Sequence, residues 1–105
     1  MAWLVLVASG VLEAVWATAM DRSDGFSRLL PSLIFAVSLL FSMAGLAFAM
    51  RSLPTGTSYA VWVGVGAVGT VILGIVLFGE PANALRLVSV GLIVAGIVGL
   101  KLATP

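Results

Sequence analysis

The first residue with a capacity for chemistry is an acid inside an apolar run. In SGVLEAVWATAM, residues 9–20, Glu13 lies near the middle of an apolar segment that begins at Trp3. An ionisable side chain at the centre of a bilayer costs on the order of several kcal/mol unless it faces a cavity or a partner. Every Arg and Lys lies near the end of an apolar run, so the sequence offers Glu13 no counter-ion at its own depth.

Glu13 is therefore either protonated or paired with a cation from outside the chain. A carboxylate that holds the two in turn would couple proton movement to cation movement. The alternative is a neutral acid that acts as a structural hydrogen-bonding contact between helices.

Small and aromatic neighbours on one helical face favour the cation interpretation. Gly10 and Trp16 lie three residues before and after Glu13, so all three share a face. Gly10 leaves room beside the carboxylate. The Trp16 indole can donate a hydrogen bond to a carboxylate, and its ring face attracts cations.

Two later segments add groups that could complete a small polar site. Ser42 belongs to a stripe with Ser38 and Gly45, and Tyr59 and Trp62 are three residues apart on a third segment. A carboxylate among indoles, a phenol and a hydroxyl could bind a small cation with directional hydrogen bonds.

The composition places these residues in a membrane protein. Of 105 residues, 62% are apolar, five are basic and four are acidic, and the mean hydropathy is +1.27. The chain has no Cys and no His, which removes thiolate and imidazole metal ligands and the commonest general base. We expect no metal, no cofactor other than protons as coupling ion, no enzymatic activity and no nucleic-acid partner.

Four apolar runs predict one all-α domain over residues 1–105 with four transmembrane helices. The expected spans are approximately 3–20, 29–50, 57–78 and 84–102. The first run lacks a basic leader, so we expect it to be a retained span rather than a cleaved signal. Because the connections are short, consecutive helices should be antiparallel neighbours.

The basic residues give almost no bias in membrane orientation. The side of the first and third connections carries three Lys or Arg residues and the other side carries two. Either another feature fixes the orientation, or the chain inserts both ways and pairs with an inverted copy of itself.

Glycines suggest further roles for the third and fourth spans. Gly91, Ala95 and Gly99 recur every four residues and form a stripe suited to helix–helix contact, although glycine is common in membrane helices. Gly64 and Gly66 lie about 200° apart around a helix. They indicate either a hinge or tight packing on two sides.

These features together resemble the small multidrug resistance transporters. The resemblance covers essentially the whole chain: four short spans, GVLEAVWATAM, LPTGTSYAVWVGVGA and GIVGLK. Trp16, three residues after Glu13, is similar to the guanidinium-exporter branch, whereas drug exporters of the family have a smaller residue there. The resemblance implies a multi-pass protein of the bacterial inner membrane. It further implies an antiparallel, dual-topology homodimer that exchanges protons for guanidinium or small substituted guanidinium cations by alternating access.

The resemblance also implies a role for each residue singled out above. Glu13 would bind the cation and the proton, with Trp16 and Ser42 donating hydrogen bonds to it. The other implied roles are lining of the site for Tyr59 and Trp62, space for Gly10, a bend at Gly64 and Gly66, and dimer contact for Gly91, Ala95 and Gly99.

The chain departs from the family pattern at two positions, and two alternative functions stay open. Asp21 stands where the family usually has a lysine, and Val63 stands where a hydroxyl residue is common. One alternative is an exporter of quaternary ammonium and other lipophilic cations. Another is one subunit of a heterodimer with a paralogous chain, for which Asp21 could be a marker.

Overall fold

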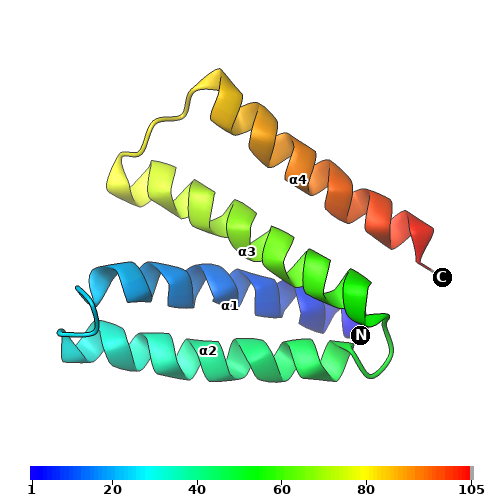
Figure 1. Ribbon diagram of the computed structural model, residues 1–105, viewed down its shortest axis with the longest axis horizontal. Coiled ribbons are helices and arrows are strands. Elements are labelled where there is room, and N and C mark those ends of the chain that lie inside the picture. The colour runs from blue at the N-terminus through cyan, green and yellow to red at the C-terminus, as the bar shows by residue number, and fades with distance from the viewer. Residues whose placement is uncertain (105) are drawn as a thin grey trace.

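The computed structural model describes residues 1–104, which form four α-helices (Figure 1). The helices are α1 (Ala2–Arg22), α2 (Leu29–Ala49), α3 (Thr55–Phe78) and α4 (Ala84–Ala103). Each is long and apolar enough to cross a membrane, and no strand occurs among the described residues. The prediction of an all-α protein with four membrane-spanning helices is therefore confirmed.

Local chemistry accounts for the first residues of α3 and α4. Pro54 precedes α3, and its fixed backbone φ angle suits the start of a helix, so α3 begins at Thr55 rather than at residue 57. The side chain of Asn83 accepts a hydrogen bond from the Arg86 backbone N–H at 2.9 Å and caps α4. α1 continues two residues beyond the predicted end to Arg22, where the polar connection begins.

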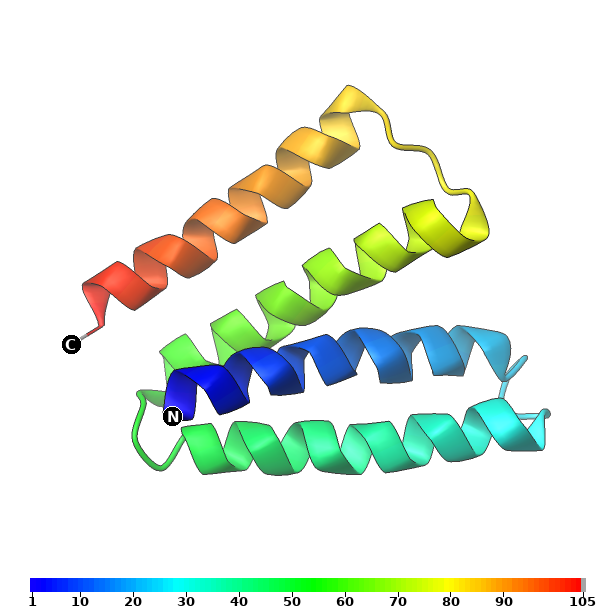
Figure 2. The same ribbon diagram turned by 180° about the vertical axis from the view of Figure 1, so that it is seen from behind.

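The helices form a flat layer rather than a closed bundle. α1 packs between α2 and α3, so these two consecutive helices are not the close neighbours that their short connection predicted, and α4 packs against α3. Figures 1 and 2 show this order from opposite sides, with the connections α1–α2 and α3–α4 at the same end. The principal extents are 43 × 34 × 17 Å. The subunit is therefore a thin slab rather than a closed ring of helices.

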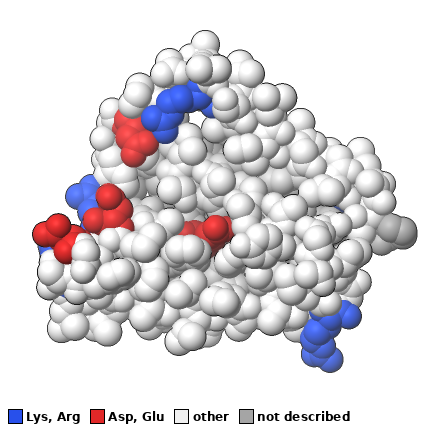
Figure 3. Space-filling model, viewed as in Figure 1, with Lys and Arg blue, Asp and Glu red and all other residues white. Residues whose placement is uncertain are grey.

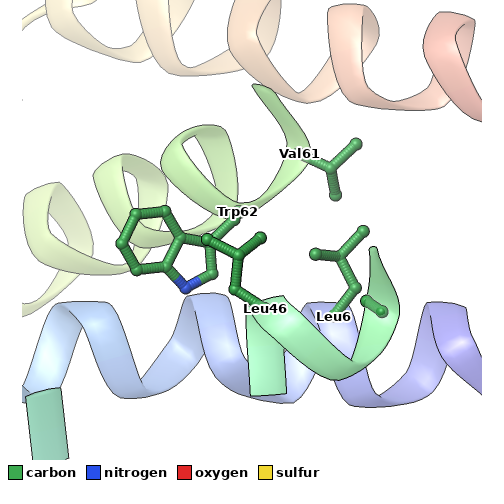
Figure 4. Close-up of a cluster of buried hydrophobic side chains, with 5 residues drawn as sticks. Leu6, Leu46, Val61 and Trp62 are labelled. Carbon is green, nitrogen blue, oxygen red and sulfur yellow. The ribbon is translucent and has the colours of Figure 1, made fainter. Parts of the chain in front are cut away.

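A small apolar core joins the first three helices. It consists of Leu6, Leu46, Ala49, Val61 and Trp62, four of which are labelled in Figure 4. α4 has no buried residue, and large apolar side chains are exposed on all four helices. Lipid or a second subunit must cover these surfaces.

Charged side chains gather near the helix ends. Arg86 pairs with Glu80 at 3.0 Å beside the α3–α4 connection, and the Arg22 guanidinium lies 4.1 Å from the Phe78 ring centroid. Figure 3 shows charges near the margins of one face and an acidic spot amid uncharged surface.

Candidate functional site

Glu13 lies near the middle of α1, and its side chain rests against Gly66 of α3. A Cβ atom added at Gly66 would lie 2.7 Å from the Glu13 Cβ and would also overlap the carboxyl group. The Glu13 Oε2 atom is buried and has no hydrogen-bond partner among the described residues. Among residues 1–104, the ion pair that forms joins Arg86 to Glu80 and not to Glu13. The described residues therefore leave this buried acceptor unsatisfied.

Trp16 lies one turn further along α1 and is also unsatisfied. Its ring meets Phe35 of α2 edge to face, with 5.9 Å between centroids and 83° between planes. The indole Nε1 atom is buried and has no hydrogen-bond partner within residues 1–104. The hydrogen bond to Glu13 that the resemblance implies is thus not formed in this subunit. A donor and an acceptor remain free on the same helix.

Ser42 and Trp62 form a buried hydrogen-bonded pair between α2 and α3. The Trp62 indole donates to the Ser42 hydroxyl at 3.0 Å, and that hydroxyl donates to the Ser9 backbone carbonyl of α1 at 2.6 Å. A serine hydroxyl has one proton to donate. In this arrangement Ser42 therefore gives its proton to Ser9 rather than to Glu13, which differs from the role that the resemblance implies.

Tyr59 lies beside Trp62, as their spacing predicted. Their ring centroids are 5.8 Å apart and the planes make an angle of 44°. Tyr59 is 54% exposed, whereas Trp62 is 7% exposed. The pair therefore runs from the buried core to an open surface of the layer.

The glycines near Glu13 bring helices together. A Cβ atom at Gly10 would lie 2.7 Å from the Val65 Cβ, so α3 fills the room that was expected beside the carboxylate. A Cβ atom at Gly64 would lie 3.0 Å from the Ile97 side chain of α4, whereas Gly66 faces α1. α3 is a continuous helix through both positions. This geometry matches tight packing on two sides, and the hinge stays a prediction.

The small-residue stripe of α4 faces away from the rest of the subunit. Gly91, Ala95 and Gly99 are exposed, and a Cβ atom added at either glycine would meet nothing within 4 Å. Its role in dimer contact stays a prediction. Asp21 and Val63, the two departures from the family pattern, are exposed as well.

An apolar groove of about 480 Å³ lies outside the candidate cation site. Its lining residues are Leu12, Leu33, Ile34, Val37, Ser38 and Phe41. None of them is charged, so the groove provides no counter-charge for a cation.

Comparison with known proteins identifies the family of this chain. The model of the family described as "Small Multidrug Resistance protein" matches residues 1–93. The chain belongs to this family. Membership makes it a multi-pass integral membrane transporter and not an enzyme.

Several proteins named "Guanidinium exporter" are similar to this family member along almost their entire length. The one from Yersinia pestis is 60% identical over 104 residues, which cover 99% of this chain and 100% of the relative. The one from Escherichia coli K12 is 59% identical over 104 residues, with 99% of both chains covered. The one from Citrobacter freundii is 56% identical over the same length.

Proposed function

We propose that this small multidrug resistance protein exports guanidinium or small substituted guanidinium cations from bacteria in exchange for protons. The observation that carries the proposal is a sequence identity of 59–60% over 104 residues to proteins named guanidinium exporters. The buried Glu13 oxygen without a partner supports it independently, because an acceptor at bilayer depth requires a donor from elsewhere.

The chemistry of guanidinium suits these residues. Its planar fork of N–H donors pairs with carboxylates through two parallel hydrogen bonds, and its face stacks on aromatic rings. Glu13 would supply the carboxylate, and Tyr59 and Trp62 would supply rings. A quaternary ammonium ion has no N–H group, so it gains nothing from the directional acceptor.

Exchange would follow because Glu13 holds either a proton or guanidinium, but not both at once. The deprotonated carboxylate binds guanidinium, and the protonated acid does not. Alternating access would then carry guanidinium outward and a proton inward. The free Trp16 donor could stabilise the charged carboxylate once a second subunit or a rotamer change brings the two groups together.

The proposed working unit is an antiparallel homodimer embedded in the bilayer. One flat subunit exposes large apolar side chains on every helix, and α4 offers its small-residue stripe to a partner. Two copies would enclose a site between two Glu13 carboxylates. If a paralogous chain is instead required, this chain alone will be inactive.

The test is transport by the purified chain in liposomes with an imposed proton gradient. We expect gradient-driven uptake of guanidinium to exceed that of tetramethylammonium at equal concentration. Faster uptake of tetramethylammonium would favour export of quaternary ammonium cations. Absence of uptake of either ion, restored by a co-expressed paralogue, would favour the heterodimer.

A further inference from the structure

Ser9 and Gly45 form a close contact between α1 and α2 beside the candidate site. Ser9 is 3% exposed, and its hydroxyl donates to the Val5 carbonyl of its own helix at 2.7 Å. A Cβ atom added at Gly45 would overlap the Ser9 hydroxyl and lie 3.0 Å from the Ser9 Cβ. The two helices can therefore meet in this way only because residue 45 has no side chain.

This contact lies next to the acceptor of the Ser42 hydroxyl. Gly45 is three residues after Ser42 and so shares its face of α2, and the Ser42 hydroxyl donates to the Ser9 carbonyl at 2.6 Å. In an α-helix the carbonyl of residue 9 also accepts the N–H of residue 13. The contact is thus one turn from Glu13 on the helix that carries the carboxylate.

The hydrogen bonds continue from Ser9 through Ser42 to Trp62, to which the proposed function assigns the lining of the site. Because Ser42 gives its only proton to Ser9, its oxygen is left as the acceptor for the Trp62 indole at 3.0 Å. Figure 4 shows the Trp62 side chain extending from α3 toward α1. A wider separation of α1 and α2 would lengthen the first bond, and because α3 packs mainly on α1 it would also move Ser42 away from Trp62.

We propose that Ser9 and Gly45 are positioning residues for the transport site. Their close packing holds the Ser9 carbonyl within reach of Ser42 and thereby fixes the Trp62 indole that lines the site. The effect on guanidinium binding rests on the proposed function. The hydrogen-bonded relay from Trp62 to Ser9 does not, so it can be tested separately.

The first measurement reports the relay without any substrate. In the ¹⁵N-labelled protein in lipid nanodiscs, the indole N–H signal of Trp62 is assigned with Trp62→Phe. Gly45→Ala should shift this signal in the same direction as Ser42→Ala, which removes the acceptor. Ser9→Ala/Gly45→Ala should restore it, because the overlapping hydroxyl is gone while the carbonyl remains. The control, Gly96→Ala, adds a methyl group where nothing lies within 4 Å.

The second measurement is guanidinium affinity in the same variants. We expect Gly45→Ala to weaken binding about fivefold, the change expected for one lost hydrogen bond, and the double variant to bind within about twofold of the parent chain. In the Ser42→Ala background, Gly45→Ala should cause no further loss, because the relay is already broken. A packing defect unrelated to the relay would instead add to the loss.

The outcomes separate this inference from the proposed function. An unshifted Trp62 signal in Gly45→Ala, or a loss that Ser9→Ala does not relieve, overturns the positioning role. If Gly45→Ala does not assemble, the test passes to Ser9→Ala/Gly45→Ala. A double variant that assembles and shows the parental Trp62 signal supports the positioning role. If neither variant assembles, the positioning role is overturned. Absence of guanidinium binding by the parent chain would overturn the proposed function, and the Trp62 signal would still decide the relay.

Discussion

Among single residues, Glu13 matters most, because residues 1–104 leave one of its carboxyl oxygens unpaired. Glu13 Oε2 is buried without a hydrogen-bond partner within residues 1–104, whereas Glu80 in the α3–α4 connection is paired with Arg86. The surroundings of the two glutamates therefore differ: Glu13 has an unpaired buried oxygen, and Glu80 forms an ion pair. They provide a matched pair of variants.

We predict that Glu13→Gln abolishes proton-driven guanidinium uptake while the protein still assembles. Glutamine keeps the size and a carbonyl acceptor, but it carries no charge and takes up no proton. Uptake is measured in liposomes, and assembly is measured by cross-linking in the membrane. Glu80→Gln serves as the control and should retain most of the uptake. Uptake by Glu13→Gln close to that of the control would show that Glu13 is not the coupling residue.

The geometry of the candidate site was predictable from the sequence to different degrees. An acid in the middle of an apolar run stands out without a structure, and so does the aromatic pair Tyr59 and Trp62. Which oxygen accepts the hydrogen bond from the Ser42 hydroxyl was not predictable, because a hydroxyl can donate to any nearby oxygen. The Ser42 hydroxyl reaches the Ser9 carbonyl because α1 and α2 approach each other closely at Gly45.

At the scale of helices, α3 connects the carboxylate on α1 to the packing of α4. Gly66 accommodates Glu13 on one face, and Gly64 accommodates the flexible end of Ile97 on another. Any movement of α3 would therefore change the surroundings of the carboxylate directly.

We predict that Gly66→Ala reduces guanidinium uptake by at least about tenfold, because the added methyl group would overlap the carboxyl and displace it or push α3 away from α1. Gly56→Ala is the control on the same helix, since a Cβ atom there meets nothing within 4 Å. Its uptake should remain within about twofold of the parent chain. Equal uptake by the two variants in liposomes would contradict the assigned contact.

The helices themselves were predictable because the apolar runs have the length of a bilayer and are separated by polar or Pro- and Gly-containing connections. The roles of the glycines were harder to predict, since spacing alone fits both a hinge and packing on two sides. Only the partners of Gly64 and Gly66 in space show that both positions are filled in this arrangement.

At the scale of the whole molecule, the shape argues for a partner that the sequence could only suggest. The subunit is 17 Å thick along its shortest axis, and α4 has no buried residue. The site residues consequently lie in a layer without a second wall. An inverted copy could provide that wall only if some chains insert the opposite way.

We predict that the chain inserts in both orientations in one membrane. The two sides carry three and two basic residues, so the positive-inside bias is almost absent. A C-terminal tag that reports its side of the membrane should give signals on both sides in cells that express this chain alone. Asp21→Lys should favour one orientation by enriching the basic side. A parent chain with its C-terminus on one side only would favour the heterodimer instead.

Competition between protons and guanidinium for Glu13 can be measured as the dependence of guanidinium affinity on pH. Affinity would be followed from about pH 5 to pH 9 by the fluorescence of Trp16 and Trp62 in the assembled protein. We expect the affinity to fall about tenfold for each pH unit over which the carboxyl becomes protonated, in two steps if the glutamates of a dimer interact. Binding to aromatic faces alone would be independent of pH. A flat profile for the parent chain would contradict the exchange mechanism.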